Sequence, residues 1–520
     1  MSIESNLLFG SSRLKNIENQ VQDLIEVAEA NIRRLTAQIG ELTAMRERER
    51  SVLSTLRLMV LPIGKLPPEL LVEIFKIVVH TPTPIFADFG ILPGPPVAQS
   101  SSALRRVHCL SQVSLYWRQI VHSTPQLWAE DIVTVSFDRQ LTDRYLEGLD
   151  ALLTRSTPWP ISVSIACDTD PSTTLQSWQA LAPIMLPTAM RWKTLQIDQG
   201  FLPHVESIPS GTLDALEWLL INHSENEPVS DLIVVFESSR RLRAFTLLSN
   251  SFYPSTIRSL RMPWLQLTHL DVSDPSMPGC RAALLQCGNL MWAKIYTSYD
   301  WDSPSPALDS PVTILPFLST LDLEFTGSPN LEEVHGLEAF IIPLALPSLK
   351  TFMLELDING EFWPTAAFTD FQSRSPHIEN FALRYSMIDS QKLITLLRHS
   401  PSLTTLDITH CSECIDNYFL DVFRWDHTAN SAPLVPKLEH LSLIDVGFSF
   451  DYGPFEEAIR SRWWKDGERV LPGGSSPPVS RLKAVSATRN DDEEYSYFGN
   501  SDTKSRMQEL VDQGLNISLR

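Results

Sequence analysis

An apolar pattern of the form L-x-x-L-x-L, with other apolar residues allowed at each position, recurs from about residue 190 to near the end of the sequence. Most intervals between successive copies are 23 to 31 residues, and the last two are 35 and 44. Chance spacing could produce two or three matches, but not ten in near-register. The copies are Trp192/Leu195/Ile197, Leu216/Leu219/Ile221, Leu242/Phe245/Leu247, Leu267/Leu270/Val272, Leu290/Ala293/Ile295, Leu318/Leu321/Leu323, Leu349/Phe352/Leu354, Ile378/Phe381/Leu383, Leu403/Leu406/Ile408, Leu438/Leu441/Leu443 and a fainter one at Leu482/Val485.

A period of this length is typical of leucine-rich repeats, in which each repeat supplies one short strand and a helical or irregular return. The sequence therefore predicts an α/β solenoid, a leucine-rich-repeat horseshoe, over residues 190–520. Several returns have a helical pattern, notably 389–401 and 231–239. Residues 131–189 are predicted to form a connector, in which segment 158–168 adds a capping strand because an open end would expose apolar edges.

The N-terminal region has the pattern of a long helix. Residues 14–58 contain no proline and a single glycine, Gly40. Steps of three and four residues, with one extra four-residue step near Ala28, are typical of a coiled coil with a stutter. Two alternatives remain open: residues 1–61 pair with a partner helix, as in a homodimer, or form a single helix folded back on the next domain. The apolar row is Leu14, Ile17, Val21, Leu24, Ala28, Ile32, Leu35, Ile39 and Leu42.

A second helical region begins at "LPPELLVEIF", residues 66–75. Proline ends the preceding helix and is well suited to the first position of a new one. Residues 81–102 are proline-rich and are predicted to form a loop. The helical pattern resumes at Leu104 and is followed by "STPQLW" (residues 123–128), in which Pro125 can begin a short turn.

These two segments, "LPPELLVEIF" and "VSLYWRQIVHSTPQLW", resemble an F-box, and the whole chain resembles the fungal F-box proteins of basidiomycete type. Those proteins carry a coiled coil, then the F-box, then degenerate leucine-rich repeats. The resemblance implies an all-α F-box domain over residues 62–130, with the insertion 81–102, that docks to a Skp-type adaptor. The alternative for each single residue is that it holds the small domain together. The residues implied to contact the adaptor are Leu66, Pro67, Leu70, Leu71, Ile74, Phe75, Val113, Trp117, Leu127 and Trp128.

Composition excludes several classes of function. The formal net charge of −20 argues against nucleic-acid binding, which needs an excess of Lys and Arg, and against an anionic membrane surface. Six scattered cysteines and the absence of a signal-peptide pattern indicate an intracellular protein, cytoplasmic or nuclear or both. No phosphate-binding, zinc-protease or nucleophile motif is present, so we expect no enzyme and no cofactor. "THCSEC" (409–414) lacks a fourth zinc ligand, which favours a structural role for Cys411.

The residues that flank the central leucines of the repeats are expected to face the concave side. Six of these are predicted to bind a target protein, and a further acidic residue of this kind is Asp198. An acidic strip would favour a basic partner, although the acidic residues could equally reflect the overall negative charge. The six are Asp271, Asp322, Glu324, Glu355, Arg384 and Asp407.

Taken together, the resemblance implies the substrate-recognition subunit of an SCF-type (cullin-RING) E3 ubiquitin ligase. The F-box would dock the adaptor and the ligase core, and the repeats would hold an unknown target near the ubiquitin carrier. The alternative is a repeat protein that serves as an interaction scaffold without a role in ubiquitination.

Overall fold

The chain divides into two compact units, with the boundary between Glu130 and Asp131. The computed structural model describes residues 4–60, 63, 66–80, 102–129, 132–137, 141–166, 171–223, 232–249, 257–298, 311–326, 336–356, 363–426, 432–447, 452–464, 478–488 and 501–519. Of the predicted insertion 81–102, only Ser102 lies within these ranges.

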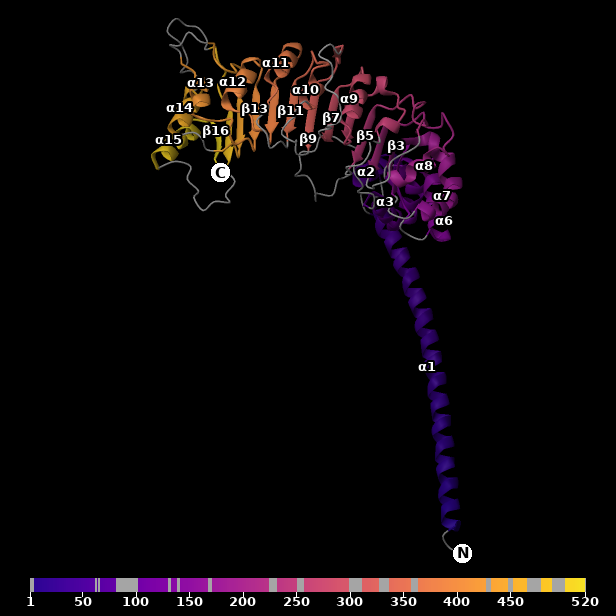
Figure 1. Cartoon of the computed structure of the whole chain (residues 1–520). Helices are drawn as coiled ribbons and strands as arrows, with labels where there is room; N and C mark the ends of the chain where they lie inside the picture. Colours follow the sequence, from indigo (N-terminus) through magenta and orange to yellow (C-terminus); the bar gives the residue numbers. More distant parts are fainter. Residues whose placement is uncertain are drawn as a thin grey trace. The chain divides into compact units, whose positions relative to one another are not determined.

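The first unit is helical. One uninterrupted helix covers the whole of the predicted segment 14–58 (Figure 1), and α2 packs against α3, α4 and α5. The Ser114 hydroxyl begins α4 by accepting a hydrogen bond from the Trp117 amide at 3.1 Å. The elements are α1 (Glu4–Val60), α2 (Pro68–His80), α3 (Ser102–Val113), α4 (Leu115–His122) and α5 (Gln126–Ala129).

The second unit is an α/β structure built on a 14-stranded sheet whose neighbouring strands are all parallel. The second and third residues of every predicted triplet lie in strands. Val485, from the fainter last copy, lies in the strand labelled β15. The predicted strand positions are therefore confirmed. The strands follow chain order: β1 (Ile132–Ser136), β2 (Ile161–Ala166), β3 (Trp192–Asp198), β4 (Trp218–His223), β5 (Ala244–Ser249), β6 (His269–Ser273), β7 (Trp292–Ser298), β9 (Thr320–Thr326), β11 (Thr351–Leu356), β12 (Asn380–Arg384), β13 (Thr405–Thr409), β14 (His440–Ile444), β15 (Ala484–Thr488) and β16 (Asn516–Leu519).

A separate two-stranded ladder joins β8 (Thr313–Ile314) to β10 (Leu344–Ala345). At the beginning of the main sheet, the segment expected to form a cap supplies β2, but the end position belongs to β1. Val133, Val135 and Phe137 of this additional strand region are buried. Strands β1, β2 and β3 therefore belong to the same sheet as the repeats that follow.

The helical returns lie along one side of this sheet (Figure 1). The helix predicted within 389–401 is confirmed as α12. The prediction of a helix at 231–239 is wrong. The described residues 232–239 contain a single β-bridge, from Ile233 to Leu260, followed by turns. The returns include α6 (Asp143–Arg155), α7 (Pro171–Met185), α8 (Leu202–Val205), α9 (Met277–Gln286), α10 (Gly336–Ile341), α11 (Thr365–Arg374), α12 (Ser390–Arg398), α13 (Asn417–Phe423), α14 (Tyr452–Ser461) and α15 (Ser501–Asp512), with 3-10 turns at η2 (Leu186–Arg191), η3 (Gln199–Phe201), η4 (Ile257–Ser259) and η5 (Trp264–Gln266).

The core of the second unit lies between the sheet and these returns. Along β9 and β11 burial alternates, with Leu321, Leu323, Phe352 and Leu354 buried, so the residues between them face the opposite side of the sheet. None of the helices in the described ranges combines the length and the apolar character that a bilayer crossing requires.

Candidate functional site

Helix α2 has apolar side chains on two sides. Leu71, Phe75 and Val79, four residues apart, are buried, and the Phe75 ring lies 4.7 Å from the Trp117 ring, centroid to centroid. Leu70 and Ile77, by contrast, are 52% and 67% exposed. One side of α2 therefore belongs to the core of its unit, and the other presents apolar surface to solvent.

The ten residues predicted to contact an adaptor separate into these two groups. Five are buried, and the buried Trp128 indole donates a hydrogen bond to the Val121 carbonyl at 2.9 Å. Leu66 is half-buried, and the remaining four are exposed. The buried residues are Leu71, Phe75, Trp117, Leu127 and Trp128, and the exposed ones are Pro67, Leu70, Ile74 and Val113. The buried five build the helical unit, which leaves the exposed four available to a partner.

Further exposed apolar residues of the helical unit were not predicted as contacts. Ile77 continues the exposed side of α2, three residues after Ile74, and Leu115 and Tyr116 at the start of α4 are also exposed. Ile77 could have been found from its spacing, since residues 70, 74 and 77 share one side of a helix.

Five of the six predicted target-binding residues come together on the side of the sheet that faces away from the buried leucines. Strand register places Asp271, Lys294 and Asp322 side by side on β6, β7 and β9. The Lys294 ammonium lies 3.8 Å from an Asp322 carboxylate oxygen. Lys294 was not predicted, although its position between Ala293 and Ile295 is the same as that of the acidic residues between their own apolar neighbours.

A second row begins two residues further along β9 and continues on β11 and β12. Glu324, Glu355 and Arg384 are neighbours on β9, β11 and β12, and the Arg384 guanidinium lies 3.9 Å from a Glu355 carboxylate oxygen. Asp407 stands apart on β13: its register neighbour on β12 is Ala382, and its carboxylate accepts a hydrogen bond from Thr409 at 3.1 Å. Asp198 accepts a hydrogen bond from Asn222 at 3.2 Å, far from this cluster in strand order.

Burial makes three acidic residues of these rows harder to ionise. It raises the pKa of Asp271 from 3.8 to about 6, with Lys294 opposing and Asp322 adding to the shift. Burial also raises the pKa of Asp322, and the pKa of Glu324 is raised by burial first and by the Glu355 charge second. An approaching cation would offset these costs, so the rows are suited to a positively charged partner.

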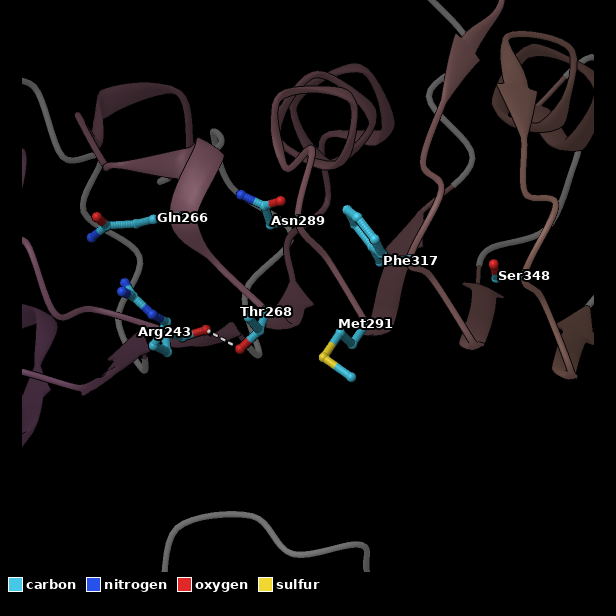
Figure 2. A pocket seen from close by; sticks show the side chains of 7 residues that line it. All are labelled: Arg243, Gln266, Thr268, Asn289, Met291, Phe317 and Ser348. Atoms are coloured by element: carbon cyan, nitrogen blue, oxygen red, sulfur yellow. Dashed lines mark hydrogen bonds between the residues drawn. The ribbon is translucent and has the colours of Figure 1, made fainter.

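A shallow pocket of about 510 Å³ lies at the corners that lead into β6, β7 and β9 (Figure 2). Its polar side chains hold neighbouring corners together: the amide of Gln266 donates to the Ser239 carbonyl at 2.6 Å, and that of Asn289 to the Leu265 carbonyl at 2.8 Å. Met291 and Phe317 are exposed beside them. The pocket offers an apolar contact and Arg243, but none of the described residues that line it carries a carboxylate, an imidazole or a thiol.

The segment "THCSEC" has a structural arrangement. Cys411 and Cys414 are buried, and the Cys414 thiol donates to the Cys411 carbonyl at 3.2 Å. The His410 ring stacks on Tyr385 and lies within hydrogen-bonding distance, 2.8 Å, of the Asp445 carboxylate. Across the described ranges, no group of three or more His, Cys, Asp and Glu side chains is arranged to hold a metal ion.

No model of a known protein family matches the sequence, and neither does any of the curated proteins compared with it.

Proposed function

We propose that the chain is the substrate-recognition subunit of an SCF-type (cullin-RING) ubiquitin ligase, with a leucine-rich-repeat solenoid as its target-binding part. The observation that carries this proposal is the exposed apolar side of α2. A short helix that already buries Leu71, Phe75 and Val79 also exposes Leu70 and Ile77. Such a surface on a small helical unit is typical of a docking site for another protein.

In this proposal the exposed side of α2 contacts a Skp-type adaptor, and the buried residues hold α2 in place. Leu70, Ile74 and Ile77 lie on one side of the helix, with Val113 as a further contact at the end of α3. The resemblance of "LPPELLVEIF" and of the later "STPQLW" segment to an F-box supports this assignment, and the ligase core would join through the adaptor. Catalysis would be supplied by that core, since the receptor acts by bringing the target close to the ubiquitin carrier.

The second part of the proposal assigns target binding to the two polar rows of the sheet. Five acidic residues and two basic ones project from the same side of strands β6 to β13, and the raised pKa values of Asp271, Asp322 and Glu324 show that negative charge is costly there. The target would be a basic segment of another protein, whose charge relieves that cost. No enzyme activity, cofactor, nucleic acid or membrane is part of the proposal, and the location would be the cytoplasm or the nucleus.

The substitution Leu70→Asp tests the docking surface. Leu70 is exposed, so the unit should fold, but an adaptor complex would have to bury an ion in an apolar contact, which costs several kcal/mol. Each ~1.4 kcal/mol is tenfold in affinity, so we expect the dissociation constant for the adaptor to rise at least a hundredfold. Met190→Asp is the matched control, because Met190 is also exposed and apolar but lies in the sheet unit.

The measurement is capture of the purified adaptor by the full chain, with circular dichroism to check that each variant is folded. Adaptor binding that is equal for the wild type, Leu70→Asp and Met190→Asp would refute the docking surface. Adaptor capture without any cullin in the complex would instead favour the scaffold without a role in ubiquitination.

A further inference from the structure

Helix α1 carries a row of apolar side chains that no described part of the chain covers. All of its side chains that the structure describes are exposed, and Leu24, Ile39 and Leu42 have exposed fractions of 68%, 64% and 65%. The row continues in the sequence at Leu14 and Ile17. A helix of 57 residues with an uncovered apolar row on one side normally pairs with another helix.

The row contains two charged positions that restrict how a partner can be oriented. After Leu42 the steps of four, three, four and three residues lead to Arg46, Glu49, Leu53 and Leu56. Arg46 pairs with Glu47 at 3.0 Å, but both side chains are well exposed, so this pair contributes little. In a parallel pair of identical helices, Arg46 would face Arg46 and Glu49 would face Glu49 in successive layers. Like charges in two adjacent layers disfavour the parallel arrangement.

In an antiparallel pair of identical helices, the apolar row of one helix can lie along the apolar row of the other. If Leu35 lies on a two-fold axis, Ala28 faces Leu42, Leu24 faces Arg46 and Val21 faces Glu49, so no like charges meet. The aliphatic part of Arg46 can cover Leu24 while its guanidinium reaches water. Next to the axis, where the extra four-residue step lies, Ile32 faces Gln38 and Ile39 faces Asn31.

A shifted antiparallel register could bring Arg46 opposite Glu49. That register would centre between these two residues, however, and would leave the apolar row before Leu35 without a partner on α1. The register centred on Leu35 covers the row on both sides of the axis, and therefore buries more apolar surface.

We propose that α1 binds a second copy of this chain in antiparallel orientation, with Leu35 at the two-fold axis. The occupant is another copy because the row is complementary to itself in this orientation. The proposal does not depend on adaptor docking or on target binding, because it uses none of the residues of α2 or of the sheet.

The first test is the mass of the full chain in sedimentation equilibrium. We expect a dimer for the wild type and a monomer for Leu35→Asp, which places two carboxylates against each other at the axis. Ala37→Asp is the matched control, since Ala37 lies two residues from both Leu35 and Ile39 and so points away from the row; it should remain a dimer. A monomeric wild type, or equal masses for the two variants, would overturn the proposal.

The second test distinguishes the orientations by disulfide formation, in a background in which Cys109 and Cys167 are replaced by serine. Leu42→Cys alone should not crosslink, because in the antiparallel pair residue 42 faces residue 28. The double variant Ala28→Cys/Leu42→Cys should give a covalent dimer, and the control Ala37→Cys/Ala44→Cys should not. Crosslinking of Leu42→Cys alone would indicate a parallel pair, and a dimer in which Ala28→Cys/Leu42→Cys fails to crosslink would refute the register.

Discussion

The raised pKa of Asp271 predicts that its carboxylate destabilises the folded protein near neutral pH. In the unfolded chain this group ionises near 3.8, whereas in the folded chain it ionises at about 6. Well below pH 3.8 both states are protonated and the group costs nothing. Between pH 4 and 6 the cost grows as pH rises, because the unfolded state gives up its proton first. Above pH 6 it is constant, at most about 3 kcal/mol at ~1.4 kcal/mol per pKa unit, and lower where water screens the charge.

The substitution Asp271→Asn removes this cost without changing the shape of the side chain. We expect the variant to melt at a higher temperature than the wild type at pH 7.5, by several degrees, with the difference much smaller at pH 4. Lys294 opposes the pKa shift, so Lys294→Met should have the reverse effect and lower the melting temperature most at pH 7.5. The assay is differential scanning calorimetry of all three proteins from pH 4 to 8. A difference between Asp271→Asn and the wild type that is independent of pH, or that favours the wild type at pH 7.5, would refute the assigned electrostatics.

Two further predictions concern the packing of the sheet unit. Gly447 has a φ of +72°, and a Cβ at this position would overlap the backbone of Ser412. The substitution Gly447→Ala should therefore lower the melting temperature measured by circular dichroism. Gly453→Ala should not lower it, because there is open space around Gly453. The fully buried Arg462 guanidinium donates hydrogen bonds to the carbonyls of Phe423, Leu434 and Val435. The substitution Arg462→Met should lower the free energy of unfolding in urea by on the order of 3 kcal/mol. An unchanged unfolding midpoint would contradict this prediction.

The strand positions could be predicted from the sequence because each strand carries its own local signal. A pair such as Leu321 and Leu323 indicates which residues of β9 are buried, without any knowledge of the neighbouring strands. Strand β1 lacks the leucine lead-in and was not predicted, although Val133 and Val135 alternate with less apolar residues. The segment 231–239 is predicted as a helix from its pattern, and its apolar run is confined to residues 232–236. Its exposed Leu232 and Val234 alternate with buried Ile233 and Val235, a period of two that excludes a helix.

The functional surfaces could be predicted only in part. The sequence places Leu70, Leu71, Ile74 and Phe75 on one helix, but a helix with apolar residues on two sides does not indicate which side its own unit covers. Lys294 and Asp322 are 28 residues apart in the sequence and become neighbours only through the register of β7 with β9. This register could not be predicted from the sequence, because the lengths of the returns between strands vary too much. The pKa of Asp271 depends on the same register, since the charges that shift it come from Lys294 on the adjacent β7 and from Asp322 on β9, one strand further away.

The order of the described strands in the main sheet is also their order in the chain. The short strands β8 and β10 form a separate two-stranded sheet. Each strand of the main sheet therefore pairs with its predecessor and its successor in the chain, and closing each pairing requires only one return of moderate length. Such a unit behaves as a one-dimensional array that can begin folding at any adjacent pair and extend in both directions. Its two ends have a neighbour on one side only, so amide hydrogen exchange should be slowest in the central strands and fastest toward β1 and β16. Partial unfolding would then shorten the array from its ends and leave the polar rows of β6 to β12 among the last parts to open.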